Sequence, residues 1–183
     1  MLDRIIDTSE VSDILRRALD GERLSVEDGV RLFKSRDLLA IGTVAHIVRT
    51  RLHGRRTFYV VNRHINYTDI CKNRCRFCAF SRSEGEKDAY AMSIDEIVKR
   101  AEEYYDQMKF TELHMVGGCH PSLPLDYYTK MLSTLKSRFP NVHLQAFTAV
   151  EIAHIADRAG LDVSDTLKLL LDAGLGSIPG GGA

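Results

Sequence analysis

The sequence predicts an α/β fold, in which a partial (β/α) barrel of parallel strands follows an N-terminal helical segment. Apolar residues recur at helical spacing over residues 1–56. From residue 57 to residue 183, short runs of β-branched and aromatic residues alternate with helical stretches. Such alternation is typical of a parallel sheet with right-handed crossovers. We therefore divide the chain into a helical segment, residues 1–56, and a barrel core, residues 57–183.

In the helical segment, two apolar stripes flank a helix start. The start is Ser25–Asp28, a hydroxyl cap followed by acids in the first turn, and Gly54 ends the segment. The two stripes consist of Val11, Ile14, Leu15, Ala18 and Leu19, and of Ile41, Val44, Ala45, Val48 and Leu52.

In the core, we expect four parallel strands at residues 57–61, 112–116, 142–147 and 176–178. A capping-box pattern at Ser93–Glu96 predicts the helix that joins the first two strands, and further helical stripes precede Pro140 and Gly174. Four parallel strands make half a barrel with an open edge. We therefore expect the chain to be the N-terminal part of a longer protein.

Length and charge limit the function classes. The 183 residues suffice for one well-packed domain, and 25 Lys and Arg residues are balanced by 25 Asp and Glu residues, so no basic excess favours nucleic acid. No apolar run approaches the ~20 residues of a membrane span, and the N-terminus lacks the apolar stretch of a signal peptide. We expect a cytoplasmic protein that acts on a small molecule, without nucleic acid or membrane as partner.

Three cysteines, Cys71, Cys75 and Cys78, form a C-x3-C-x2-C pattern with Phe77 before the last one. Three thiolates on one tight loop can hold three irons of a [4Fe–4S] cluster and leave the fourth iron open. An open iron can chelate the amino and carboxylate groups of S-adenosylmethionine (SAM) and pass an electron into its sulfonium. The loop also follows a strand, where parallel α/β folds place their sites. We predict a cluster and SAM as cofactors.

A non-catalytic zinc module is the alternative from a different class. Zinc needs four ligands, usually as paired C-x2-C units, and Cys119 is the only other thiol. The two hypotheses differ over this residue, which the zinc module needs as its fourth ligand and the cluster does not. Cys119 is also compatible with a packing role.

Other candidate site residues follow the expected strands. Gly117 and Gly118 close the second strand, where bare backbone lets a ligand approach, as the SAM amino group would require. Thr148 and Glu151 leave the third strand, and they also form a capping-box pattern. His120 is the best-placed histidine for substrate or proton chemistry.

Three further histidines lie on or beside strands. His64 follows the first expected strand, and its neighbours Asn62 and Arg63 could face the barrel interior. His114 and His143 alternate with apolar residues along their strands, so either could point inward. We assign them no individual role.

Five segments of the chain form a recognisable set: VNRHIN, CKNRCRFCAFSR, HMVGG with the following His-Pro, AFTAVEI and SIPGGGA. Through these segments the chain resembles the aminofutalosine synthase family of radical SAM enzymes. The resemblance covers almost the whole chain, and the chain departs from the family pattern at Tyr67–Asp69 and at Cys119.

The resemblance implies a TIM-like partial barrel and a transferase that consumes SAM as substrate. The family adds the 5′-deoxyadenosyl radical to 3-[(1-carboxyvinyl)oxy]benzoate and forms aminodeoxyfutalosine for menaquinone biosynthesis. It also implies an electron donor such as flavodoxin or ferredoxin. Arg63, Arg82 and His120 are the expected contacts of the two substrate carboxylates, and Phe77, Gly117, Gly118, Thr148 and Glu151 the expected contacts of the cofactor.

The similar dehypoxanthine futalosine cyclase and the synthase of the deazaflavin chromophore remain alternatives. A shortened chain that binds a cluster without turnover is a third possibility, because family members continue well past the last glycines.

Overall fold

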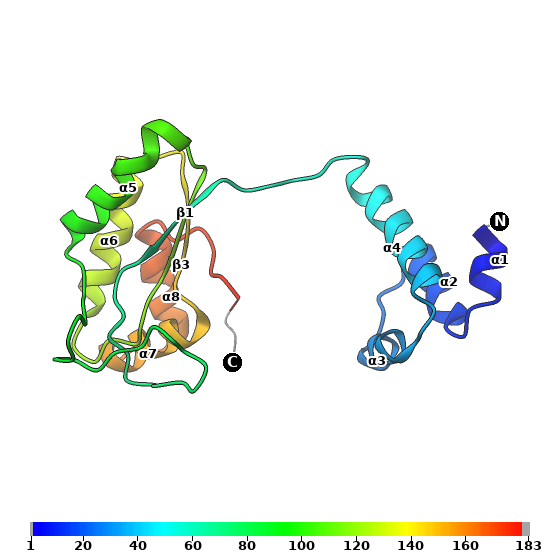
Figure 1. Cartoon of the computed structure of the whole chain (residues 1–183), viewed down its shortest axis with the longest axis horizontal. Coiled ribbons are helices and arrows are strands. Elements are labelled where there is room, and N and C mark those ends of the chain that lie inside the picture. The colour runs from blue at the N-terminus through cyan, green and yellow to red at the C-terminus, as the bar shows by residue number, and fades with distance from the viewer. Residues whose placement is uncertain (1, 181–183) are drawn as a thin grey trace. The chain divides into compact units, whose positions relative to one another are not determined.

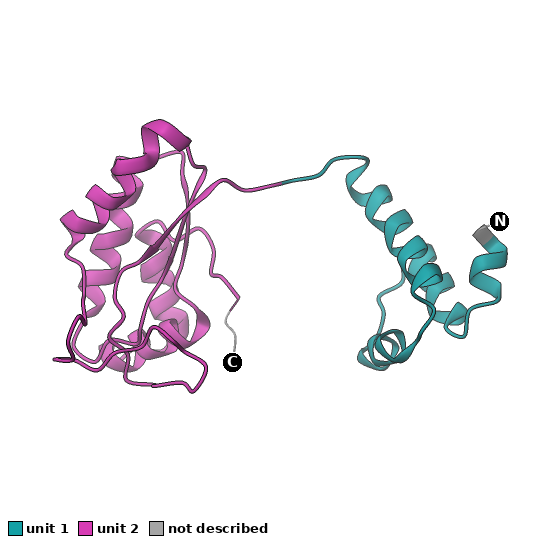
Figure 2. Cartoon of the chain, viewed as in Figure 1, with its two compact units in different colours: residues 1–58 teal, residues 59–183 magenta. Residues whose placement is uncertain are grey.

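The computed structural model describes residues 2–180, which form two compact units that divide between Phe58 and Tyr59 (Figure 2). The first unit is entirely helical. Its elements are α1 (Leu2–Asp7), α2 (Ser12–Asp20), α3 (Val26–Lys34) and α4 (Leu38–His53). Within residues 2–180, no helix has both the length and the apolar character needed to cross a membrane.

The first unit confirms the expected helix signals. Ser25 caps α3 in a reciprocal capping box with Asp28, and Gly54 follows the last turn of α4. The apolar stripes of α2 and α4 meet in one small core. Its fully buried residues are Ile6, Val11, Ile14, Leu15, Ala40 and Val44.

The second unit is a three-stranded parallel sheet with four helices, a partial barrel that is not closed. Its strands run in the order β1-β2-β3. The elements are β1 (Asn62–Asn66), α5 (Ile94–Met108), β2 (Glu112–Val116), α6 (Leu125–Arg138), β3 (His143–Ala146), α7 (Ala149–Ala159) and α8 (Val163–Asp172). The second expected strand is confirmed residue by residue, and the third begins and ends one residue inside its expected bounds.

The first expected strand is wrong by five residues. The segment at 57–61 has β-type composition, yet it forms no strand, and Phe58, Tyr59 and Val60 are exposed. Pairing with β2 falls on Asn62–Asn66 instead. The composition of residues 57–61 favours a strand, but the register of the ladder decides which residues pair with β2. Three of the residues that do pair, Asn62, His64 and Asn66, are polar because they face away from the helices. The fourth expected strand is reduced to an isolated parallel bridge between Ser177 and Gln145.

The sheet has two chemically different faces. Ile65, Leu113, Met115, Leu144 and Ala146 alternate along the strands and are fully buried in one core with residues of α5, α6, α7 and α8. Figure 1 shows α5 and α6 on one side of the strands. The intervening residues are exposed or half-buried. We call this second surface the polar face, and it consists of Asn62, His64, Asn66, Glu112, His114, Val116, His143 and Gln145.

Candidate functional site

The cysteine loop lies against the turn that follows β2, at the carboxyl edge of the sheet. The Gly118 N–H donates to the Thr68 carbonyl at 3.0 Å, and the Lys72 N–H donates to the Cys119 carbonyl at 3.1 Å. The Cys119 N–H donates to the Cys71 sulfur at 3.3 Å. A sulfur that accepts a backbone N–H is suited to carry negative charge, as a cluster thiolate must.

The donor set of this loop fits a [4Fe–4S] cluster. Cys71, Cys75 and Cys78 are free thiols, and Cys75 and Cys78 are exposed. Within residues 2–180, no three His, Cys, Asp or Glu side chains converge on a position for a single metal ion. A cubane makes a different demand, because each thiolate binds its own iron and the sulfurs need not converge on one point. The three free thiols of this loop can provide one ligand for each of three irons.

Cys119 differs from the other three cysteines. It is buried, its sulfur accepts a hydrogen bond from Asn73 Nδ2 at 3.4 Å, and its thiol reaches the Val150 carbonyl at 3.9 Å. Burial, followed by the nearby charge of Cys71, raises the pKa of the Cys119 thiol to about 12. Buried between Asn73 and the Val150 carbonyl, Cys119 has the surroundings of a packing residue.

Arg74 supports the cysteine loop from within the first spacer. Its φ of 46° places it in the left-handed region, which a non-glycine residue seldom adopts without support. The Arg74 Nη1 donates to Ser83 Oγ and to Glu86 Oε1, both at 2.6 Å. Arg74, followed by Ser83, lowers the pKa of Glu86 to about 2. The pair is solvent-exposed, so it positions the loop more than it stabilises the fold.

Arg82 holds the loop through its backbone. The Cys71 N–H donates to the Arg82 carbonyl at 3.0 Å, and the Arg82 N–H donates to the Asp69 carbonyl at 2.9 Å. The Arg82 guanidinium donates to the Ser81 carbonyl at 3.4 Å. The expected contact between this guanidinium and a substrate stays a prediction. Phe77 projects from the loop and is 97% exposed, so its expected cofactor contact also stays a prediction.

A buried carboxylate holds the Gly-Gly turn. Glu151 is 3% exposed, and its Oε1 accepts the Tyr67 hydroxyl at 2.6 Å and the Gly117 N–H at 2.9 Å. Its Oε2 accepts the Thr148 N–H at 2.8 Å and the Thr148 hydroxyl at 2.7 Å. Burial, followed by the charge of Glu151, raises the pKa of Tyr67, which keeps its proton to donate.

These contacts change the expected roles of Thr148 and Glu151. The capping box is confirmed, and both Glu151 oxygens are occupied by donors of the chain itself. Glu151 fixes the Gly117 backbone, and the expected cofactor contacts of Thr148, Glu151 and the two glycines stay predictions. Sequence reasoning missed Tyr67, which is fully buried and lies against Gly117. The available signal was its position directly after a strand, at the same edge as the two glycines.

We expect Glu151→Gln to lower the free energy of unfolding by about 1–3 kcal/mol, because the amide leaves at least one buried donor without an acceptor. Urea unfolding followed by circular dichroism measures this change. Glu96→Gln is the matched control, because Glu96 occupies the same capping-box position on α5 and is exposed. Equal losses for the two variants would contradict the buried network.

Arg63 and His120, two of the predicted substrate contacts, are held by other residues of the chain. Arg63 lies on the helix-covered face, where its guanidinium carbon is 4.2 Å from the centre of the Tyr104 ring of α5. This placement argues against its expected contact with a substrate carboxylate. His120 is 5% exposed, its Nδ1 accepts the Ser122 N–H at 3.1 Å, and burial lowers its pKa. The His120 side chain is enclosed, and its expected contact with a substrate carboxylate stays a prediction.

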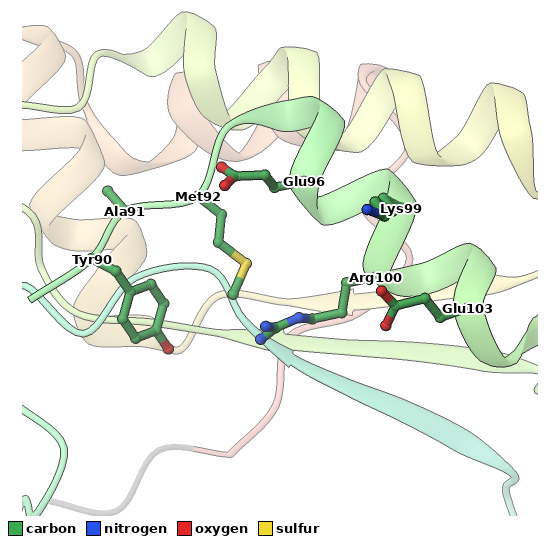
Figure 3. A pocket seen from close by; sticks show the side chains of 7 residues that line it. All are labelled: Tyr90, Ala91, Met92, Glu96, Lys99, Arg100 and Glu103. Carbon is green, nitrogen blue, oxygen red and sulfur yellow. The ribbon is translucent and has the colours of Figure 1, made fainter. Parts of the chain in front are cut away.

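A surface pocket of about 310 Å³ opens along the first turns of α5 (Figure 3). Arg100 extends toward Tyr90 and Met92 in this view, and no cysteine lines the pocket. The α5 residues that line it are two acids and two bases, as on a solvated helix face, so we assign it no part in the site. The lining residues are Tyr90, Ala91, Met92, Glu96, Lys99, Arg100 and Glu103.

Comparisons with known proteins point to one superfamily. The profile of the Radical SAM superfamily matches residues 65–181. Aminodeoxyfutalosine synthase of Streptomyces coelicolor is 46% identical over 97% of this chain and 46% of its own length. Cyclic dehypoxanthine futalosine synthase of Halalkalibacterium halodurans is 41% identical over 94% of this chain and 47% of its own length.

A third relative is named for a different activity. The 5-amino-6-(D-ribitylamino)uracil–L-tyrosine 4-hydroxyphenyl transferase of Trichormus variabilis is 38% identical over 93% of this chain and 45% of its own length. The chain spans about half the length of the curated relatives it matches. The matched region includes the cysteine loop, the Gly-Gly turn and all three strands but the first three residues of β1. The chain belongs to the radical SAM superfamily, whose members use a [4Fe–4S] cluster and SAM.

Proposed function

We propose that this chain carries the cluster- and SAM-binding part of an aminodeoxyfutalosine synthase acting on 3-[(1-carboxyvinyl)oxy]benzoate. The observation that carries the proposal is the 46% identity to the Streptomyces coelicolor enzyme over 97% of the chain. When bound, the cluster and SAM would supply a 5′-deoxyadenosyl group by one-electron reduction of the sulfonium. We propose that methionine leaves, that the deoxyadenosyl group becomes bonded to the methylene carbon of the enolpyruvyl double bond, and that the adduct rearranges. The rearranged adduct would lose the enolpyruvyl carboxyl group as carbon dioxide and return the electron, so that the reaction is redox-neutral overall.

The residues of the chain would hold these groups in place. Cys71, Cys75 and Cys78 would each bind one iron, and the Cys119 N–H would remain on the Cys71 sulfur. The Gly117 and Gly118 backbone would receive the SAM amino group, because a glycine turn lets a ligand approach closely. Glu151 would keep that turn fixed before SAM arrives. Preorganisation of this kind lowers the cost of ordering the site on binding.

Anaerobic reconstitution with iron and sulfide, followed by electron paramagnetic resonance (EPR) of the reduced protein, tests the proposal. We expect a [4Fe–4S]⁺ signal whose shape changes when SAM is added, because SAM would occupy the open iron. Formation of aminodeoxyfutalosine and methionine from SAM and the enolpyruvyl substrate is then measured. A signal that SAM leaves unchanged would remove the proposal, and one bound zinc that Cys119→Ala abolishes would favour the zinc module.

A cyclic dehypoxanthine futalosine synthase is the second candidate, favoured by the 41% identity to the Halalkalibacterium halodurans enzyme. The same assay separates the two candidates by substrate. SAM turnover with dehypoxanthine futalosine, and none with the enolpyruvyl ether, would select the second candidate.

A further inference from the structure

The polar face of the sheet differs from the usual surface of a parallel sheet. Parallel strands are commonly covered on both faces and are apolar on both. Here the helix-covered face follows that rule, whereas the polar face carries histidines, amides and one carboxylate. Side chains of this kind gain little from packing against an apolar layer, because each buried polar group needs a partner. The composition therefore suits contact with a polar ligand.

One row of this face joins all three strands. His64 of β1, His114 of β2 and Gln145 of β3 are paired in register across the sheet. The two imidazole rings are stacked, with centroids 5.1 Å apart and planes inclined by 25°. Residues in register on one face of a sheet stand side by side, so the three side chains present their polar atoms at one level.

Most polar atoms of this row are free. His64 Nε2 donates to Asn66 Oδ1 at 2.6 Å, which leaves Nδ1 without a partner in the part of the chain that the structure describes. Nδ1 donates to a carboxylate only when the ring carries both of its protons. Within the described residues 2–180, neither His114 nitrogen has a hydrogen-bond partner, and the nearest carboxylate oxygen, Oε1 of Glu112, is 4.0 Å from Nδ1. The side chain of Gln145 also has no hydrogen bond to these residues. By contrast, His143 Nε2, on the same face, is 2.8 Å from Ser177 Oγ.

We propose that His64, His114 and Gln145 bind the aryl carboxylate of the substrate. This inference rests on the proposed function, in which the substrate has an aryl carboxylate at one end and the reacting double bond at the other. His64 lies two residues before the end of β1. At the rise of a parallel strand, the row is therefore about 6.6 Å below the end of the strand. The cysteine loop lies at the strand ends, so the reacting end would face that edge and the aryl carboxylate would lie deeper, at the row.

The chemistry of the row fits one carboxylate. Imidazole N–H and amide N–H groups donate hydrogen bonds, and hydrogen bonds to an ionised carboxylate are shorter and stronger than neutral ones. The row also provides what Arg63 does not, because Arg63 is held on the other face against Tyr104. Glu112, one pleat deeper, is acidic and would repel an anion that moved further down.

The test compares two ring-preserving variants with one matched control. His64→Phe and His114→Phe keep an aromatic ring at each position but remove its nitrogens. His143→Gln is the control, because it removes a histidine of the same face that is already hydrogen-bonded to Ser177. Circular dichroism and the iron and sulfide content of the reconstituted proteins establish that each variant folds and holds its cluster.

The probes are 3-hydroxybenzoate and its neutral analogue 3-hydroxybenzamide, with affinities measured by equilibrium dialysis against reconstituted protein in the presence of SAM. We expect each Phe variant to raise the Kd of 3-hydroxybenzoate at least tenfold, and the double variant about a hundredfold. The Kd of 3-hydroxybenzamide should change less than threefold, and His143→Gln should change neither value more than twofold.

Two outcomes would overturn the inference. If wild-type protein binds 3-hydroxybenzoate and both Phe variants bind it equally well, the row is not the carboxylate site. If wild-type protein does not bind 3-hydroxybenzoate, no such site exists on this chain. Neither outcome decides the proposed function, which is judged separately by SAM turnover with the enolpyruvyl ether.

Discussion

Replacing Cys75 by alanine is expected to abolish the iron–sulfur cluster while leaving the fold intact. After anaerobic reconstitution, the wild-type chain should hold about four iron atoms, and Cys75→Ala should hold almost none, because two thiolates cannot retain a cubane. Cys75 is exposed, so its loss should change the free energy of unfolding of the metal-free chain by at most about 0.5 kcal/mol. Iron analysis and circular dichroism measure the two effects.

Cys119→Ala is the matched control for this prediction. Its sulfur is buried beside the Val150 carbonyl, outside the C-x3-C-x2-C loop, so its removal should leave the iron content unchanged. A loss of iron in Cys119→Ala equal to that in Cys75→Ala would show that four thiols act together. That result would contradict the three-cysteine site and revive the zinc hypothesis.

Gly118→Ala is expected to destabilise the second unit by about 3 kcal/mol or more. A Cβ at this position would lie 2.1 Å from the Ile70 carbonyl oxygen, 2.7 Å from the Ile70 carbonyl carbon and 2.8 Å from Cys71 Cβ. Two of these atoms are backbone, so no side-chain rotation relieves the overlap, and overpacking of a rigid region costs about 1–3 kcal/mol or more. The cysteine loop and the turn would have to separate.

Urea unfolding followed by circular dichroism measures this loss, since the chain has no tryptophan to serve as a fluorescent probe. Gly180→Ala serves as control, because a Cβ there meets nothing within 4 Å. An unfolding midpoint of Gly118→Ala equal to that of the control would mean that the two loops do not touch. We also expect Gly118→Ala to lose its cluster, because separation of the two loops would take the Cys119 N–H away from the Cys71 sulfur.

Local signals predicted much of the fold. The capping boxes at Ser25, Ser93 and Thr148 depend on residues three apart, and all three form. The second and third strands were also predictable, because their apolar residues alternate on a buried face. The first strand was not, since its polar residues face away from the core and only pairing with β2 identifies them.

The error in the first strand also explains the misplaced arginine. A strand at 57–61 would leave Arg63 in a loop, free to reach the site. The observed strand instead fixes the direction of each side chain, and Arg63 shares the helix-covered face with Ile65 while His64 takes the other. A two-residue period makes such assignments depend entirely on knowing where the strand lies.

The candidate site shows the same division between local and distant signals. The three cysteines lie within eight residues, so their spacing alone predicts a common loop. The hydrogen bond from Tyr67 to Glu151 joins residues 84 apart in the chain. No sequence pattern encodes such a contact, because it arises only when the ends of parallel strands meet.

The two-faced sheet has a consequence for how relatives of this chain can diverge. The strands contribute Ile65, Leu113, Met115, Leu144 and Ala146 to the core, whereas the residues of the polar face are absent from it. Substitutions at the latter positions can alter ligand preference without a matching loss of fold stability. Relatives 38–46% identical to this chain are named for three different reactions. A scaffold in which stability and specificity occupy alternate positions of the same strands lets new specificities arise by single substitutions.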